Sequence, residues 1–263
     1  EAAAAPEAAA PEVVAVRWGA TEGRLGAGAG ASRLVTGNHP LYAALEDALA
    51  RSKQAEAALV FGSGYLTNIG VIPALVGRGD IIFADKLVHA CLLDGAQLSG
   101  ATLKRFRHND AAHLNTLLAE HRGQYTNALI LVDHVYSMDG DVAPLAELSA
   151  LAKAQDSWLM VDDAHGLGMV ESHAEMDVWM GTLSKSAGSY GGYVIAKRAV
   201  VDMLVTRARS MLFSTGLPPS ACAAALTSLQ VMAREPERGT RPLMLAKRVC
   251  DARSEEHTSE LQS

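Results

Sequence analysis

The sequence predicts an α/β fold with a mostly parallel sheet flanked by helices. Short apolar runs typical of buried strands alternate with segments whose apolar residues recur at helical spacing. In addition, 49% of the 263 residues are hydrophobic, which is enough for a sizeable core. Strands that alternate with helices pair in parallel, because each helical crossover returns the chain to the same end of the sheet.

Each element follows from a local pattern. Residues 23–40 are rich in glycine and small side chains, so we expect a loop that leads into a helix at 41–52. Residues 57–76 then predict a strand, a Gly-Ser-Gly turn and a helix. The alternation continues with a strand and a helix within 80–100, a strand at 101–108, a helix at 111–121, a strand at 127–137, a helix at 144–155 and a strand at 157–165. After residue 200 the chain is mainly helical, with one helix at 217–234.

Composition argues against several classes of protein. The net charge is -6 and the basic residues are scattered, which disfavours nucleic acid as a partner. No apolar run approaches roughly 18 residues and no signal segment opens the chain, so we expect neither a membrane span nor secretion, and a cytoplasmic location. The three cysteines form no CxxC pair, which favours neither a disulfide framework nor a metal site. The GAGAGAS run lacks a clear preceding strand, so dinucleotide binding is disfavoured.

Both ends of the sequence differ from its middle. Residues 1–25 suggest the remnant of an N-terminal helix, and residues 26–235 are expected to form one large cofactor-binding domain. Residues 236–252 would begin the connection to a small domain that is missing. Residues 253–263, RSEEHTSELQS, resemble a translated sequencing adapter and are expected to be non-native.

Lys185 is the first candidate for chemistry. It lies in GTLSKSAGSYGGY, a turn of small and hydroxyl residues that includes Thr182, Ser184 and Ser186. A lysine that binds pyridoxal 5'-phosphate covalently as a Schiff base needs such a constrained turn beside a phosphate site. The alternative is a surface lysine in a Gly/Ser loop.

Asp162 and His165 follow an apolar strand, at the end where α/β sheets bind ligands. A carboxylate there is placed to pair with a pyridinium nitrogen, and His165 could bind the phenolic oxygen of the ring or move a proton. The alternative is an aspartate that caps a helix beside a loop histidine.

Two further motifs are compatible with the same cofactor. His89 begins an apolar helical stretch and could stack on a planar ring, although most such histidines are core or capping residues. The turn around Ser63 and Gly64 could hold a phosphate through its backbone N–H groups, or could be an ordinary strand-to-helix turn.

Eight stretches in order resemble the α-oxoamine synthase family of fold-type I pyridoxal-phosphate enzymes, from about residue 26 to residue 234. The stretches are GAGASRLVTGNHPLYAALE, FGSGYLTN, LVHACLLDGA, RFRHND, YSMDGDVAPLAEL, VDDAHGLG, GTLSKSAGSYGGY and FSTGLPP. Members share the fold of class I and II aminotransferases. The resemblance implies an acyltransferase that condenses an amino acid with an acyl-CoA or acyl thioester and releases CO2.

The resemblance also implies roles for individual residues. Lys185, His165 and His89 are expected to be catalytic, and Lys185 would hold the cofactor. Further cofactor contacts are implied for Asp162 at the ring nitrogen, for Ser63, Gly64, Tyr65 and Thr182 on the phosphate side, and for Ser137 at the wall of the site. Asp133 matches an acidic position. Ser214 and Thr215 match residues that reach the phosphate of a neighbouring subunit, so a homodimer with shared active sites is implied.

The sequence departs from the family pattern in three places. The segment between His165 and Lys185 is about nine residues shorter than in the family. The N-terminal motif and the C-terminal domain with its carboxylate-binding arginine are absent. Two alternatives therefore stay open: a different fold-type I reaction, such as transamination or aldol cleavage, and a noncatalytic fragment that binds the cofactor. RFRHNDAAHL and YSMDGDVAPLAEL favour one subfamily over its relatives.

Overall fold

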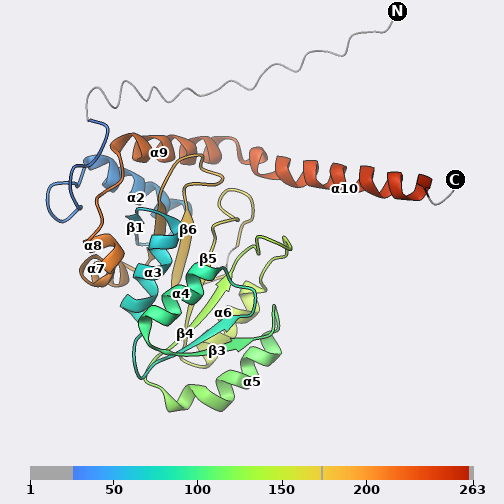
Figure 1. The fold of residues 1–263 in the computed structure, drawn as a ribbon, viewed down its shortest axis with the longest axis horizontal. Helices are drawn as coiled ribbons and strands as arrows, with labels where there is room; N and C mark the ends of the chain where they lie inside the picture. The colour runs from blue at the N-terminus through green and yellow to red at the C-terminus, as the bar shows by residue number, and fades with distance from the viewer. Residues whose placement is uncertain (1–25, 173, 261–263) are drawn as a thin grey trace, which may run out of the picture.

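The computed structural model describes residues 26–172 and 174–260, and it describes no side chain beyond residue 253 (Figure 1). The expected N-terminal helix remnant at 1–25 lies outside the described residues. No helix in the described ranges is both long enough and apolar enough to cross a bilayer.

A seven-stranded sheet forms the centre of the molecule, with strand order β1-β7-β6-β5-β4-β2-β3. The four pairs β2/β3, β2/β4, β4/β5 and β5/β6 are parallel, whereas β7 pairs antiparallel with both β1 and β6. The predicted mostly parallel α/β sheet is therefore confirmed. The strands are β1 (Ala57–Phe61), β2 (Ile81–Asp85), β3 (Thr102–Phe106), β4 (Ala128–Asp133), β5 (Trp158–Asp162), β6 (Val178–Thr182) and β7 (Gly192–Ala196).

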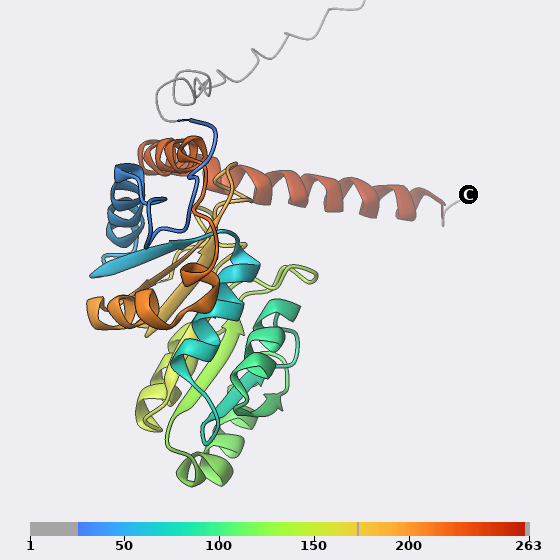
Figure 2. The same cartoon turned by 60° about the vertical axis from the view of Figure 1, so that its left-hand side comes forward.

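Helices cover both faces of this sheet (Figures 1 and 2). Buried side chains of α2, α5, α6 and α9 share one hydrophobic cluster, and those of α3, α4, α7 and α8 share the other. Within β4, Ile130 faces the first cluster and Leu131 the second, because successive side chains of a strand point to opposite faces. The helices are α2 (Pro40–Ser52), α3 (Gly64–Leu75), α4 (Ala90–Ser99), α5 (Ala111–His121), α6 (Leu145–Ala154), α7 (Arg198–Arg207), α8 (Arg209–Leu212), α9 (Pro219–Arg234) and α10 (Arg241–Glu260), with short 3-10 turns η1 (Arg122–Gln124) and η2 (Pro236–Thr240).

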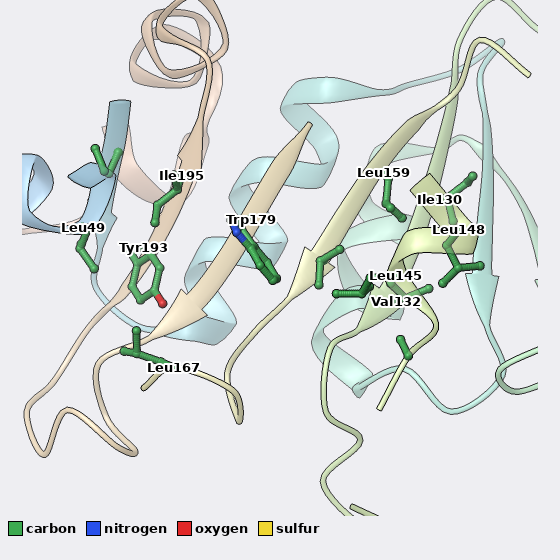
Figure 3. Packing of buried hydrophobic residues seen from close by; sticks show 14 of the residues in the cluster. Leu49, Ile130, Val132, Leu145, Leu148, Leu159, Leu167, Trp179, Tyr193 and Ile195 are labelled. Carbon is green, nitrogen blue, oxygen red and sulfur yellow. The ribbon is translucent and has the colours of Figure 1, made fainter. Parts of the chain in front are cut away.

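The first cluster shows how the two ends of the sheet are joined. Leu49 of α2 packs near Tyr193 and Ile195 of β7, Trp179 of β6 follows, and Ile130 lies with the α6 side chains farther along (Figure 3). Strands β6 and β7 were not predicted as strands from the sequence. Each has five residues including a glycine, Gly181 in β6 and Gly192 in β7, so the apolar run is too short to mark a strand clearly.

The last helix lies apart from the sheet. Helix α10 extends away from the layers, and Leu243, Met244, Leu245 and Val249 on it are exposed (Figures 1 and 2). It runs from 241 to 260 without a break, past residue 253, where the sequence suggests that a non-native tail begins. The domain boundaries at 235 and 252 stay predictions.

The strand register brings three polar residues to one edge. Asp133 at the end of β4 pairs in register with Asp162 at the end of β5, and Thr182 ends the adjacent β6. All three are almost fully buried. The carboxyl ends of parallel strands are where open α/β sheets bind ligands.

Candidate active site

A cavity of about 190 Å³ lies at this edge of the sheet. Most of the predicted cofactor residues meet there, although they come from separate parts of the chain. They are Ser63, Gly64, Tyr65, His89, Asp162, His165, Thr182 and Lys185, and Asp133, at the expected acidic position, lines the cavity as well. The structure thus brings most of the predicted site residues together around one cavity.

Lys185 and His165 form the closest contact between two predicted catalytic side chains. Lys185 Nζ lies 2.7 Å from His165 Nε2. Lys185 is exposed at the cavity, whereas His165 is half-buried. Burial, together with the positive charges of Lys185 and His89, lowers the pKa of His165 below its ordinary value. A neutral imidazole is therefore favoured, and such a ring can accept a proton or a hydrogen bond.

Asp162 is held by two donors at the end of β5. Asn68 Nδ2 donates to Oδ2 at 2.8 Å, and the backbone N–H of Ala164 donates to Oδ1 at 3.0 Å. The alternative role as a helix cap is not observed, because Asp162 is followed by turns within the described residues. Burial outweighs the two donors and the charges of Lys185 and His89, so the pKa of Asp162 lies above its ordinary value. A carboxylate in this position favours a cationic partner in the cavity.

The sequence did not indicate the role of Asn68. It lies one turn after Gly64 on α3, so both face the cavity side of the helix, and its amide also lies 3.0 Å from Cys91 Sγ. The available signal for a role in the site was that Asn68 ends FGSGYLTN, one of the stretches that resemble the family. The cavity is also lined by residues that were given no role, namely Cys91, Val135, Ala164, Met180 and Ser184.

His89 is the N-cap of α4. Its Nδ1 accepts from the backbone N–H of Cys91 at 3.2 Å, and its own N–H donates to Asp133 Oδ1 at 3.3 Å. The structure thus shows the capping role considered from the sequence, and the exposed imidazole also lines the cavity. Stacking on a ring remains a prediction.

The start of α3 has the geometry of an anion site. Ser63 caps the helix by accepting from Leu66 N at 3.1 Å. The backbone N–H groups of Gly64 and Tyr65 lie in the first turn, where a helix offers no internal acceptor. A Cβ on Gly64 would come within 3.2 Å of Thr182 Cβ, so this end of the helix lies against β6. The Tyr65 hydroxyl donates to Asp94 at 2.8 Å.

Three predicted residues do not line the cavity. Ser137 is exposed in a turn after β4. Thr215 makes an isolated antiparallel bridge with Ser32, and Ser214 precedes it. The resemblance implies that these last two residues reach the phosphate of a neighbouring subunit, and that role stays a prediction.

The short segment between His165 and Lys185 does not separate the two residues. Strand β5 ends just before His165 and β6 lies within the segment, and the two strands pair in parallel, with Met160 opposite Val178. A larger cavity of about 390 Å³ lies between this segment and α9, with Leu167, Ser186 and Met232 in its lining. None of the predicted site residues lines that second cavity.

Comparison with known proteins defines the class. The family model for aminotransferase class I and II matches residues 6–256, so the chain belongs to this family. Among curated relatives, an 8-amino-7-oxononanoate synthase of Methylorubrum populi is 60% identical over 238 residues, which cover 90% of this chain and 61% of the relative. The synthase of Methylocella silvestris is 54% identical, with 86% and 67% covered. This chain therefore spans about 61% of the length of the first of these relatives.

Solved structures agree on the fold. A serine palmitoyltransferase from S. paucimobilis, solved with PLP and myriocin bound, has a TM-score of 0.78 at 31% identity, with 82% of this chain and 58% of that chain covered. An 8-amino-7-oxononanoate synthase from Francisella tularensis has a TM-score of 0.74 at 24% identity, with 93% and 72% covered, and shows the fold alone. The α-oxoamine synthase resemblance is confirmed. The subfamily favoured by RFRHNDAAHL and YSMDGDVAPLAEL is the one named in the curated relatives.

Proposed function

We propose that this chain is the cofactor-binding part of a pyridoxal-phosphate-dependent acyltransferase, and that the whole protein is an 8-amino-7-oxononanoate synthase of biotin synthesis. Such an enzyme joins alanine to a pimeloyl thioester with release of CO2. The observation that carries the proposal is the meeting of Lys185, His165 and buried Asp162 in one cavity beside the start of α3. The curated relatives support the choice of substrates.

The residues of the cavity fit the cofactor on chemical grounds. Asp162 provides a buried carboxylate for a pyridinium nitrogen, oriented by Asn68 and the Ala164 N–H. The first N–H groups of α3 provide donors for a phosphate. Lys185 provides a primary amine that opens onto the same cavity. When bound, pyridoxal phosphate supplies an aldehyde carbon for covalent attachment and an electron-withdrawing protonated ring.

The chain's own residues then perform the remaining tasks. Lys185 Nζ would hold the cofactor covalently, and as a free amine it would accept the proton from the substrate Cα. His165 Nε2, close to Nζ and favoured as neutral, can accept a hydrogen bond from the ammonium of Lys185 or pass its proton on. Asp162 would direct its carboxyl group toward the ring nitrogen, where a pyridinium cation favours the ionised form. His89 bounds the cavity from the α4 side. Ser214 and Thr215 complete the phosphate site of a second subunit in the proposed homodimer.

Turnover by the whole protein tests this proposal. The purified chain, extended to the full length of its relatives, is supplied with pyridoxal phosphate, alanine and a pimeloyl thioester. We expect equal amounts of free thiol and CO2, and loss of both in Lys185→Ala. Lys153→Ala is the matched control, because Lys153 is an exposed lysine of α6 that pairs with Glu175 away from the cavity. Keto-acid formation from alanine without thiol or CO2 release would instead indicate transamination.

A further inference from the structure

The RFRHND and YSMDGD motifs meet outside the cavity, in a cluster to which the proposed function gives no role. His108 Nδ1 lies 3.0 Å from Asp85 Oδ1, and His108 Nε2 lies 2.6 Å from Asp141 Oδ2. Asn109 joins the same two carboxylates, with its N–H 2.8 Å from Asp85 Oδ2 and its Nδ2 2.6 Å from Asp141 Oδ2. The imidazole packs edge-on against the buried Tyr136 ring, with centroids 4.4 Å apart.

The geometry favours a charged imidazole. Both ring nitrogens face carboxylate oxygens, and only the protonated ring has two N–H donors. Burial lowers the pKa of His108, but the hydrogen bonds and charges of Asp85 and Asp141 outweigh this and raise it above the ordinary value. His108 therefore links two separate carboxylates by charge-assisted hydrogen bonds.

Each of the two aspartates is hydrogen-bonded within a segment that leads to the cavity wall. Asp85, which is fully buried at the end of β2, accepts from Leu87 N at 2.7 Å and so fixes the turn that leads to His89. Asp141 lies in the hairpin after β4, where the N–H of Tyr136 donates to its carbonyl at 3.0 Å. That hairpin also contains the Val135–Val142 bridge, and Val135 lines the cavity.

We propose that His108 is a positioning residue that clamps these two segments, and thereby places His89 and Val135 at the cofactor cavity. The cavity is the one assigned above, so the inference rests on the proposed function for its consequence in cofactor binding. The clamp itself is a property of the chain without cofactor. It can be measured separately.

The clamp has two arms, the hydrogen bond from His108 to Asp85 and the one from His108 to Asp141, and two amide variants separate them. In His108→Asn the amide nitrogen replaces Nδ1 and can keep the bond to Asp85. In His108→Gln the amide nitrogen replaces Nε2 and can keep the bond to Asp141. Hydrogen exchange of the cofactor-free protein reports each arm, through the Leu87 amide for the first and the Tyr136 and Ala143 amides for the second.

We expect opposite patterns in the two variants. His108→Gln should lower the exchange protection of the Leu87 amide by about tenfold and leave the Tyr136 and Ala143 amides unchanged. His108→Asn should do the reverse. A tenfold change is the scale expected for one lost hydrogen bond to a charged group. His108→Gln should also weaken binding of pyridoxal phosphate several-fold more than His108→Asn. Equal loss of amide protection at both segments in both variants would overturn the clamp. Opposite exchange patterns with unchanged cofactor affinity would overturn the positioning role of His108. Failure of the wild-type chain to bind cofactor would count against the proposed function. The exchange pattern of the two variants would still show whether His108 links the two segments.

Discussion

Asp133 and Asp162 lie opposite each other in register at the ends of β4 and β5, and both are buried in one cavity wall. The two carboxyl groups differ in their donors. Asp162 receives hydrogen bonds from Asn68 and the Ala164 N–H, whereas Asp133 receives one long bond from the His89 N–H. Burial, followed by the charge of Asp162, raises the pKa of Asp133 to about 8. Asp162 is therefore the better placed of the two to stay ionised.

This difference predicts a pH dependence of stability. Because the pKa of Asp133 is raised in the folded protein, folding takes up a proton between its ordinary value and about 8, and stability falls as pH rises through that window. One proton changes the unfolding free energy by at most about 1.4 kcal/mol per pH unit. In Asp133→Asn, the urea midpoint of the cofactor-free protein should fall less between about pH 5 and about pH 8 than in wild type. Asp139→Asn, at an exposed position, should retain the wild-type slope, and a wild-type slope in Asp133→Asn would disprove the prediction.

The charge of Lys185 should be visible in the titration of His165. Lys185→Met removes the positive charge 2.7 Å from Nε2, so the pKa of His165 should rise, while burial should still hold it below its ordinary value. NMR titration of the His165 ring in the cofactor-free protein measures this. Lys153→Met should leave that titration unchanged. An unaltered His165 pKa in Lys185→Met would show that the two side chains are not in contact.

Much of the fold and site was predictable because it depends on apolar runs and short motifs within contiguous stretches of the sequence. The strands that end in Asp133 and Asp162 are uninterrupted apolar runs, and the resemblance placed Lys185, His165, His89 and Asp162 in one site. Strands β6 and β7 were missed because each has only five residues, includes a glycine and borders the Gly/Ser-rich segment between them. Asn68 and the Asp85–His108–Asp141 contacts were missed because they join residues far apart in sequence, which no single motif can reveal.

Gly192 is a position where the fold allows no side chain. A Cβ there would lie 2.4 Å from Thr67 Oγ1, 2.5 Å from Ser63 O and 2.6 Å from Gly64 N. Gly192→Ala should therefore displace the start of α3 and lower the unfolding free energy by about 1–3 kcal/mol, with weaker cofactor binding. Gly123→Ala is the control, since a Cβ at Gly123 meets nothing within 4 Å. Urea denaturation compares them, and equal stabilities would contradict the expected crowding.

An ion pair between Lys53 and the buried Asp163 lies outside the lining of the cavity. Lys53 Nζ is 3.2 Å from Asp163 Oδ2 and 4.2 Å from the centre of the Trp179 ring, while His134 Nδ1 is 2.6 Å from Asp163 Oδ1. Lys53→Met would leave the buried carboxylate with His134 alone. We expect a loss of about 3 kcal/mol in unfolding free energy, the lower end for one partner of a buried pair.

The surface pair of Lys153 and Glu175 is the matched comparison. Both side chains are largely exposed, so Lys153→Met should change the unfolding free energy by less than about 1 kcal/mol. Chemical denaturation of the two variants side by side gives the difference. Similar small losses in both would mean that Lys53 does not compensate the charge of Asp163.

Borohydride trapping tests the central claim most directly. The folded chain is treated with pyridoxal phosphate, reduced and digested, and the modified lysine is located by mass spectrometry. We expect an absorbance band at roughly 420 nm before reduction, and the cofactor fixed on the peptide that contains Lys185. Lys153→Ala should be modified in the same way, and Lys185→Ala should not be modified. Cofactor fixed on another lysine, or none fixed on a folded wild-type chain, would contradict the account.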